Sequence, residues 1–179
     1  MRRDPIVIVA YDSGWPAAFE SERVRVEAAM KPWLVRPVEH IGSTAIPGLA
    51  AKSIVDMLAV VSNVDEASHA VETLRPLGWQ HAAEPGDALG RRLSFCSPSI
   101  AHRTHHLHVV EEGSDGWRRW LAFRDYLRLH PELAAEYATL KCSLAEKYGT
   151  DPNERDRYRN GKAAFIEEIS SRAVEGNPS

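Results

Sequence analysis

Residues 40–58 read HIGSTAIPGLAAKSIVDML, and this stretch decides the fold. Its pattern predicts a strand, a turn of small residues, a short helix and a second, more apolar strand. Gly42 lets the backbone come close to a ligand, while Ser43 and Thr44 offer hydroxyl groups. The free amides of the following helical turn can accept a phosphate. The stretch is therefore predicted to bind an anion.

The end of this stretch has a superficial likeness to a Walker A loop, because Gly48 precedes Lys52 and Ser53. In a Walker A loop the lysine directly follows the glycine, whereas here it lies four residues further on. A loop that wraps phosphates cannot form in that register. The sequence therefore excludes the P-loop class of nucleotide-binding proteins.

Predicted strands and helices alternate along the chain on both sides of this stretch. Strands are expected over 6–10, 35–41, 54–61, 92–97 and 105–110. Helices are expected over 15–30 and 63–74, followed by three helical segments that begin near 117, 131 and 158. Strands dominate the first two thirds and helices close the chain. We therefore expect an α/β fold of the α+β kind, with a mixed β-sheet covered by helices and C-terminal helices after it.

Length and hydrophobic content set the domain organisation. With 179 residues, 44% of them hydrophobic, the chain can bury one sizeable core, and its composition does not shift along its length. One domain is expected over 1–173, followed by a disordered tail over 174–179.

Charge and cysteine content exclude several classes of protein. The formal net charge is −3, so no global field attracts nucleic acid or a membrane, and any anion site must be local. Cys96 and Cys142 are too far apart in sequence to favour a disulfide framework or a zinc–thiolate site. The apolar run over 6–10 is too short for a signal peptide or a membrane span. A cytoplasmic protein without a membrane partner is expected.

The Gly42-Ser43 turn after one strand, with Asp56 on the next, resembles the signature of the nucleotidyltransferase superfamily. More closely, the chain resembles the GrpB family in three ordered stretches, which are 39–56, 106–109 and 123–131. The resemblance implies a nucleotidyltransferase-like mixed sheet. It also implies that the turn contacts a triphosphate and that Asp56 binds a divalent metal.

In active members of that superfamily a second carboxylate follows two residues after the first. Side chains at that spacing on a strand share a face and can hold two metal ions together. The equivalent residue in this sequence is Leu58. The usual two-metal arrangement is therefore incomplete on this strand.

Histidines are candidates for completing a metal site with Asp56. His106 and His108 alternate along one strand and share a face, and His105 is expected to face away from them. His40 lies on the strand that leads into the turn. Spacing alone allows His40, Asp56 and His108 to converge, with His106 beside them. Nitrogen and oxygen ligands favour zinc or manganese, so the predicted divalent cofactor stays open among magnesium, manganese and zinc.

Basic side chains outside the turn are candidates for contacting phosphates. Arg91 and Arg92 are adjacent before a strand, so only one of them should point inward. Arg124 and Arg128 share one face of a helix, where the alternative is a solvated surface with salt bridges. The predicted phosphate-binding cations are Lys52, Arg92, Arg124, Arg128 and Lys162.

Two functions are consistent with these features. One is metal-dependent nucleotidyl transfer by an enzyme, with Asp56 and His108 as catalytic residues. The other is a catalytically degenerate nucleotide-binding or accessory module that lacks the second metal carboxylate. A third, a metal-dependent hydrolase, is indicated by His106 and His108 alone. The expected partner is a nucleotide or another phosphate-bearing small molecule; the sequence gives no strong nucleic-acid signal and does not indicate an oligomeric state.

Overall fold

The computed structural model describes residues 5–175, and within them five strands form one mixed sheet. The spatial order is β1-β2-β5-β4-β3. The strands are β1 (Glu39–Ile41), β2 (Val55–Val61), β3 (Gln80–His81), β4 (Arg92–Pro98) and β5 (Arg103–Glu111). β2 and β5 run parallel, and the other neighbouring pairs are antiparallel. The expected mixed sheet covered by helices is confirmed.

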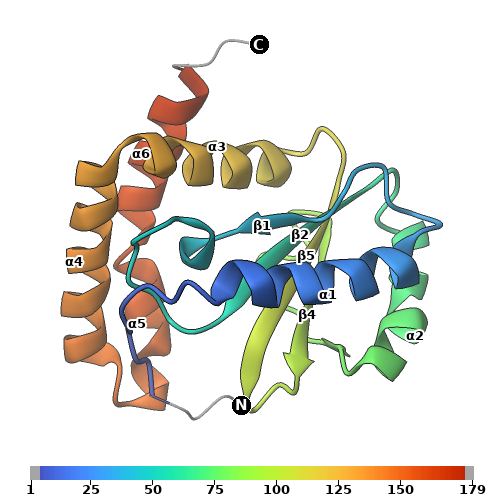
Figure 1. The fold of residues 1–179 in the computed structure, drawn as a ribbon, viewed down its shortest axis with the longest axis horizontal. Coiled ribbons are helices and arrows are strands. Elements are labelled where there is room, and N and C mark those ends of the chain that lie inside the picture. The colour runs from blue at the N-terminus through green and yellow to red at the C-terminus, as the bar shows by residue number, and fades with distance from the viewer. Residues whose placement is uncertain (1–4, 176–179) are drawn as a thin grey trace.

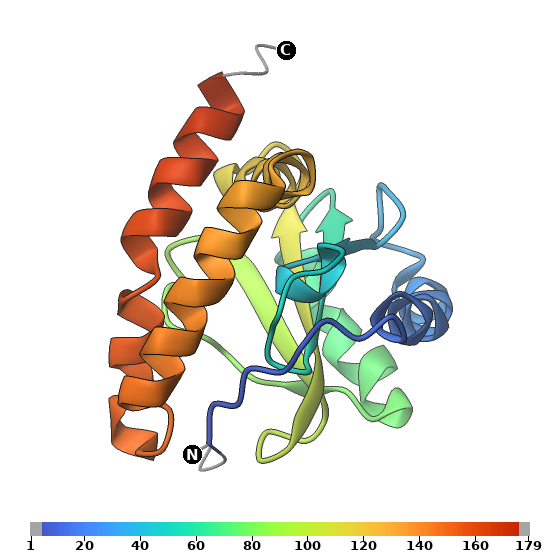
Figure 2. The same ribbon diagram turned by 60° about the vertical axis from the view of Figure 1, so that its left-hand side comes forward.

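Helices lie on both sides of the sheet (Figures 1 and 2). They are α1 (Trp15–Met30), α2 (Ala70–Leu74), α3 (Asp115–Leu129), α4 (Pro131–Tyr148), α5 (Arg155–Asn160) and α6 (Ala163–Glu175). Figure 2 shows α1 and α2 on one side and α4, α5 and α6 on the other, with α3 crossing one end. The helix expected to begin near 158 is in fact two, because the chain turns between α5 and α6. Helix α6 takes in two residues of the expected tail, and residues 176–179 lie outside the described residues.

Alternation along β2 divides its side chains between two cores. Met57 is fully buried on the face covered by α1, where it belongs to the same cluster as Met30. Leu58 and Val60 point to the opposite face and pack beneath α3. Asp56 has the parity of Leu58, and it therefore faces the side of the sheet on which the C-terminal helices stand.

Three strand predictions are confirmed and the others need correction. The expected strands at 54–61, 92–97 and 105–110 correspond to β2, β4 and β5. The segment 6–10 makes only an isolated bridge between Val9 and Ala51. The expected strand at 35–41 is reduced to β1, since Pro37 before it has no N–H to donate. The two-residue β3 at the sheet edge was not predicted.

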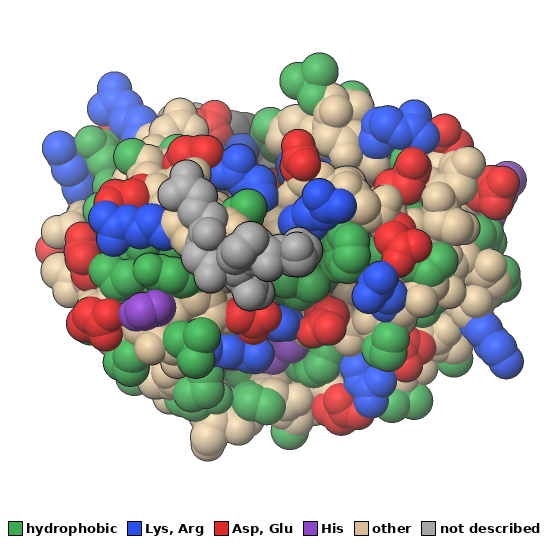
Figure 3. Space-filling view, turned by 90° about the horizontal axis from the view of Figure 1, so that it is seen from above, with side chains coloured by type: hydrophobic (Ala, Val, Ile, Leu, Met, Phe, Trp, Pro, Cys, Tyr) green, Lys and Arg blue, Asp and Glu red, His purple; other side chains and the backbone are tan. Residues whose placement is uncertain are grey.

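The surface shows no dominant charge on the face drawn in Figure 3. Basic and acidic side chains are interspersed there, as the nearly balanced composition predicts. None of the helices within residues 5–175 combines the length and apolar character needed to span a bilayer.

Candidate functional site

The predicted turn and the predicted carboxylate lie directly against each other. Gly42 has φ +70° and ψ −170°, a conformation open essentially to glycine alone, and a 3₁₀ turn over Ser43–Ala45 follows it. Ile41 pairs with Asp56 across β1 and β2. A β-carbon added to Gly42 would collide with the Asp56 carboxylate. The absence of a side chain at Gly42 is therefore what lets the turn approach Asp56.

A cavity of about 540 Å³ opens beside this pair. Its walls come from the turn, β2, β5, the connection between β3 and β4, and helices α3 to α6. The basic side chains that line it are Lys52, Arg92, Arg119, Lys141, Arg159 and Lys162. These outnumber the lining carboxylates Asp56 and Glu84. Although the whole chain is slightly acidic, the cavity is suited to an anion.

Asp56 is the centre of a group able to hold a metal ion. One ligand atom each from Asp56, His106 and His108 lie within 4.8 Å of one another. His106 Nδ1 is 3.1 Å from Asp56 Oδ1. Burial opposes the charge of Asp56, but the hydrogen bond with His106 and the positive charge of neighbouring groups outweigh it, so the pKa of Asp56 lies below its ordinary value. A carboxylate beside imidazole nitrogens is a kind of donor set that fits a transition metal, and Asp56 alone fits magnesium together with ligand oxygens.

The parity predicted for β5 is confirmed. His106 and His108 share the face of Asp56, whereas His105 lies on the other face against Trp79, with ring centroids 6.2 Å apart. The His108 ring is tilted against Trp120, and burial lowers the pKa of His108 to about 4. The imidazole is therefore neutral near pH 7.

His40 and Thr44 are not brought to the cavity. His40 pairs with Met57 across the sheet, which places it on the α1 face, where its ring stacks on Phe19. Its Nε2 is 3.0 Å from the hydroxyl of Thr44, which is itself buried. The convergence expected of His40 with Asp56 is therefore wrong, because His40 pairs with Met57, whose side chain lies on the face of the sheet opposite to Asp56.

Ser43 faces the cavity, where Lys141 of α4 donates a hydrogen bond to its hydroxyl at 2.9 Å. Lys141 is almost fully buried and also donates to the carbonyl of Ala50. Burial, with Lys162 close by, lowers the pKa of Lys141 to about 7. Lys141 was not among the predicted phosphate-binding residues, yet it bonds directly to the serine of the turn.

Lys52 and Lys162 both line the cavity, close to Tyr158. Their ammonium groups lie 5.7 Å and 4.7 Å from the centre of the Tyr158 ring. Burial, and then Arg159, lower the pKa of Lys162, while Asp56 acts in the opposite direction. The aromatic ring and two amines form one compact side of the cavity.

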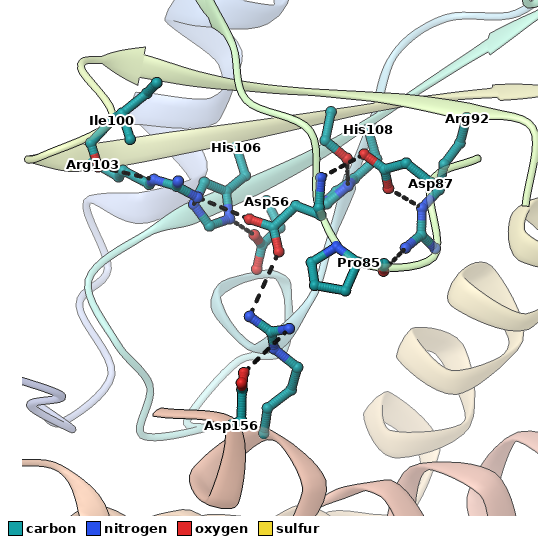
Figure 4. A network of polar contacts seen from close by, with 12 residues as sticks. Asp56, Pro85, Asp87, Arg92, Ile100, Arg103, His106, His108 and Asp156 are labelled. Atoms are coloured by element: carbon teal, nitrogen blue, oxygen red, sulfur yellow. Dashed lines mark hydrogen bonds and ion pairs between the residues drawn. The ribbon is translucent and has the colours of Figure 1, made fainter. Parts of the chain in front are cut away.

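Arg91 and Arg92 divide as expected. Arg91 is exposed and pairs with Asp65 on the outer surface. Arg92 lines the cavity, and its guanidinium bonds Asp87 and the carbonyl of Pro85 (Figure 4). Arg92 is therefore in place to face a ligand, but its donors are partly used within the protein.

Arg124 and Arg128 do not line this cavity. Arg124 is buried and bonds Glu39 at 2.7 Å and the carbonyl of His40 at 2.9 Å. Arg128 donates twice to the carbonyl of Ala45. Both were expected to contact phosphate. Instead they bond α3 to backbone carbonyls on either side of the turn, so in this structure they stabilise the turn.

A polar network that the sequence did not reveal borders Asp56 (Figure 4). Glu84 accepts from Arg103 at 2.9 Å and lies 3.9 Å from Arg159. Arg103 in turn reaches His106. Glu84 lies in an irregular connection and Arg103 at the start of a strand, so neither has a periodic pattern that could place it.

The chain matches the family described as "GrpB protein" over residues 5–172. It is 37% identical to UPF0157 protein YqkA of Bacillus subtilis across 94% of its length, and it spans about half of that protein, 47%. The crystal structure of conserved protein GrpB from Enterococcus faecalis superimposes with a TM-score of 0.83 and 33% identity, covering 95% of this chain and 98% of the other.

A more distant likeness concerns the fold alone. The Cid1 poly(U) polymerase crystal structure matches with a TM-score of 0.50 and 14% identity, over 78% of this chain and 42% of that one. The mixed sheet is thus nucleotidyltransferase-like. Because the family match extends over nearly the whole chain and a solved GrpB structure superimposes on it, the chain belongs to the GrpB family.

Proposed function

We propose that this chain binds the phosphates of a nucleotide, together with a divalent cation, in the cavity beside Gly42 and Asp56, and that it transfers a nucleotidyl group. The observation that carries the proposal is the contact between the Gly42 backbone and the Asp56 carboxylate in a cavity rich in basic side chains. The glycine-serine turn suits phosphate oxygens, and the carboxylate suits a cation bound to the same phosphates.

Each cavity residue has a distinct part in the proposal. Ser43 offers its hydroxyl to phosphate while Lys141 holds that hydroxyl in place. Lys52 and Lys162 balance the charge of the phosphates, and Asp56 holds the cation. When bound, the cation would neutralise charge that develops on the phosphates during transfer.

A nucleotide-binding module without catalysis is the second candidate, and one observation favours it. Leu58, at the position of the second carboxylate, is fully buried in the apolar cluster beneath α3. No second acid can therefore enter from that position. The hydrolase alternative rests on His106 and His108 only.

Calorimetric titration of nucleoside triphosphates, with and without magnesium or manganese, tests the proposal on wild type, Asp56→Asn and Asp65→Asn. Asp65 is an exposed carboxylate outside the cavity and serves as the matched control. The proposal expects binding that tightens with metal in wild type and Asp65→Asn and loses its metal dependence in Asp56→Asn. Binding indifferent to both metal and Asp56 favours the module, and no binding of any nucleotide refutes both.

The transfer step needs its own measurement. Release of pyrophosphate from a bound triphosphate, in the presence of candidate hydroxyl acceptors, distinguishes the enzyme from the module. Turnover that requires metal and disappears in Asp56→Asn supports transfer.

A further inference from the structure

Both ring nitrogens of His106 are already occupied by protein groups. Nδ1 lies 3.1 Å from Asp56 Oδ1, and Nε2 lies 3.3 Å from a terminal guanidinium nitrogen of Arg103. A guanidinium has N–H donors and no acceptor, so Nε2 must accept and carries no proton. The single proton of the neutral ring is therefore on Nδ1, which donates it to Asp56.

Arg103 is fixed in this position by its other contacts. The same terminal nitrogen donates to Glu84 at 2.9 Å, and Nε donates to the carbonyl of Ile100 at 3.3 Å. Its side chain is only 12% exposed. Figure 4 shows Arg103 reaching His106 from the side opposite to Asp56. Arg103 is therefore fixed by several contacts, and its position beside His106 is not that of a mobile surface side chain.

Coordination of a metal by His106 conflicts with this arrangement. A metal on Nδ1 requires the proton to move to Nε2, where it would point at an N–H of Arg103. A metal on Nε2 would have to displace the guanidinium itself. In either case the charge-assisted contact with Arg103 is lost.

His108 has a different environment. Its Nδ1 lies 3.4 Å from the hydroxyl oxygen of Ser94, which can accept a hydrogen bond from Nδ1–H. Among residues 5–175, its Nε2 has no hydrogen-bond partner. With Nδ1 carrying the proton, the lone pair of Nε2 is left for a ligand from outside the protein.

We infer that His106 is a positioning residue: held by Arg103 and Glu84, it donates from Nδ1 to orient the Asp56 carboxylate, and His108 is the histidine that can coordinate a metal. The inference rests on the proposed function in one respect, which is that Asp56 binds the metal. The protein then offers one carboxylate and one imidazole, and the remaining ligands come from the phosphates and water.

Long-range ¹H–¹⁵N correlation spectra of the imidazoles test this directly, with assignments from His106→Gln and His108→Gln. In metal-free wild type we expect the proton of the singly protonated His106 ring on Nδ1. A proton on His106 Nε2 would overturn the inference. This measurement requires no bound ligand.

Adding Zn²⁺ to the same sample separates the two histidines. His108 Nε2 is expected to move to the shift of a coordinated nitrogen while both His106 nitrogens keep theirs. Coordination through His106 contradicts the inference. If neither ring responds to Zn²⁺, the role of His108 as a ligand fails, whereas the tautomer of His106 still decides its positioning role and the titrations with magnesium and nucleotide decide the proposed function.

Arg103→Met and Arg103→Lys form a matched pair. The methionine variant frees Nε2, so the proton should shift towards Nε2, and Zn²⁺ should bind about tenfold more tightly, because no charge-assisted contact has to be broken. The lysine variant keeps a donor and should stay close to wild type. An unchanged His106 tautomer and an unchanged Zn²⁺ affinity in Arg103→Met would refute the role of Arg103. If a variant folds poorly, the wild-type spectra still decide which nitrogen of His106 carries the proton.

Discussion

Gly42 and Asp56 are so close that the carboxylate occupies the space a β-carbon on residue 42 would need. Asp56 lies on β2 and Gly42 directly follows β1, whose last residue, Ile41, pairs with Asp56. The Gly42 backbone and the Asp56 carboxylate therefore form one continuous part of the cavity wall.

Gly42→Ala should lower the free energy of unfolding by about 3 kcal/mol or more, because it combines a forbidden backbone conformation with a collision. Gly48→Ala is the control, since Gly48 also has positive φ, +78°, but open space around it. Its cost should be about 1–2 kcal/mol, from backbone strain alone. Chemical denaturation measures both, and equal losses would show that the contact with Asp56 is unimportant.

Lys141 should make stability rise with pH. Its pKa in the folded protein is about 7, against 10.5 for the free side chain. Between these values the unfolded chain binds more protons than the folded one, so the free energy of unfolding increases from about pH 7 towards pH 10. Lys141→Met should flatten this slope, and Lys147→Met, an exposed lysine on the same helix, should not. Urea denaturation across this range provides the measurement; identical slopes in all three proteins would contradict the assignment.

Arg124 and Lys162 should separate stability from ligand binding. Arg124→Met removes bonds to Glu39 and to the His40 carbonyl and should cost about 2 kcal/mol of stability. Its effect on nucleotide affinity should be small in the folded protein. Lys162→Met should do the reverse, weakening nucleotide binding by about tenfold. Paired thermal melts and calorimetric titrations test this, and a reversed pattern would restore Arg124 as a phosphate ligand.

Leu58→Asp should not rebuild a two-carboxylate metal site. The residue is fully buried with Val60 and Val110, and Trp117 and Trp120 pack against this cluster. An unpaired carboxylate there should cost more than about 3 kcal/mol, whereas Leu58→Met should cost less than about 1.5 kcal/mol. A Leu58→Asp variant that is as stable as wild type and binds a second Mn²⁺ in an electron paramagnetic resonance titration would refute this.

Sequence patterns predicted what depends on local spacing. The period-two alternation of β5 correctly placed His106 and His108 on one face, and the apolar run at 54–61 correctly predicted β2. Sequence patterns failed where the pairing register of two strands decides which face of the sheet a side chain occupies. His40 faces α1 because it pairs with Met57, and no feature of residue 40 alone reveals that partner.

Side chains on helices and in irregular connections were harder to place than those on strands. Arg124 and Arg128 have the spacing of a ligand-binding face, but the packing of α3 directs them to backbone carbonyls near the turn. Glu84 reaches the cavity from a connection without periodicity. Such positions depend on contacts between distant segments, which composition and periodicity do not encode.

Lys141 of α4, Tyr158 of α5 and Lys162, which follows α5, belong to segments made after the whole sheet. Synthesis proceeds from the N-terminus, so a nascent chain exposes Asp56, Lys52 and the glycine turn before the cavity amines of Lys141 and Lys162 exist. Nucleotide capture by the growing polypeptide is thereby deferred until translation has passed Lys162, and a stalled product carrying only the sheet would be unable to sequester the ligand.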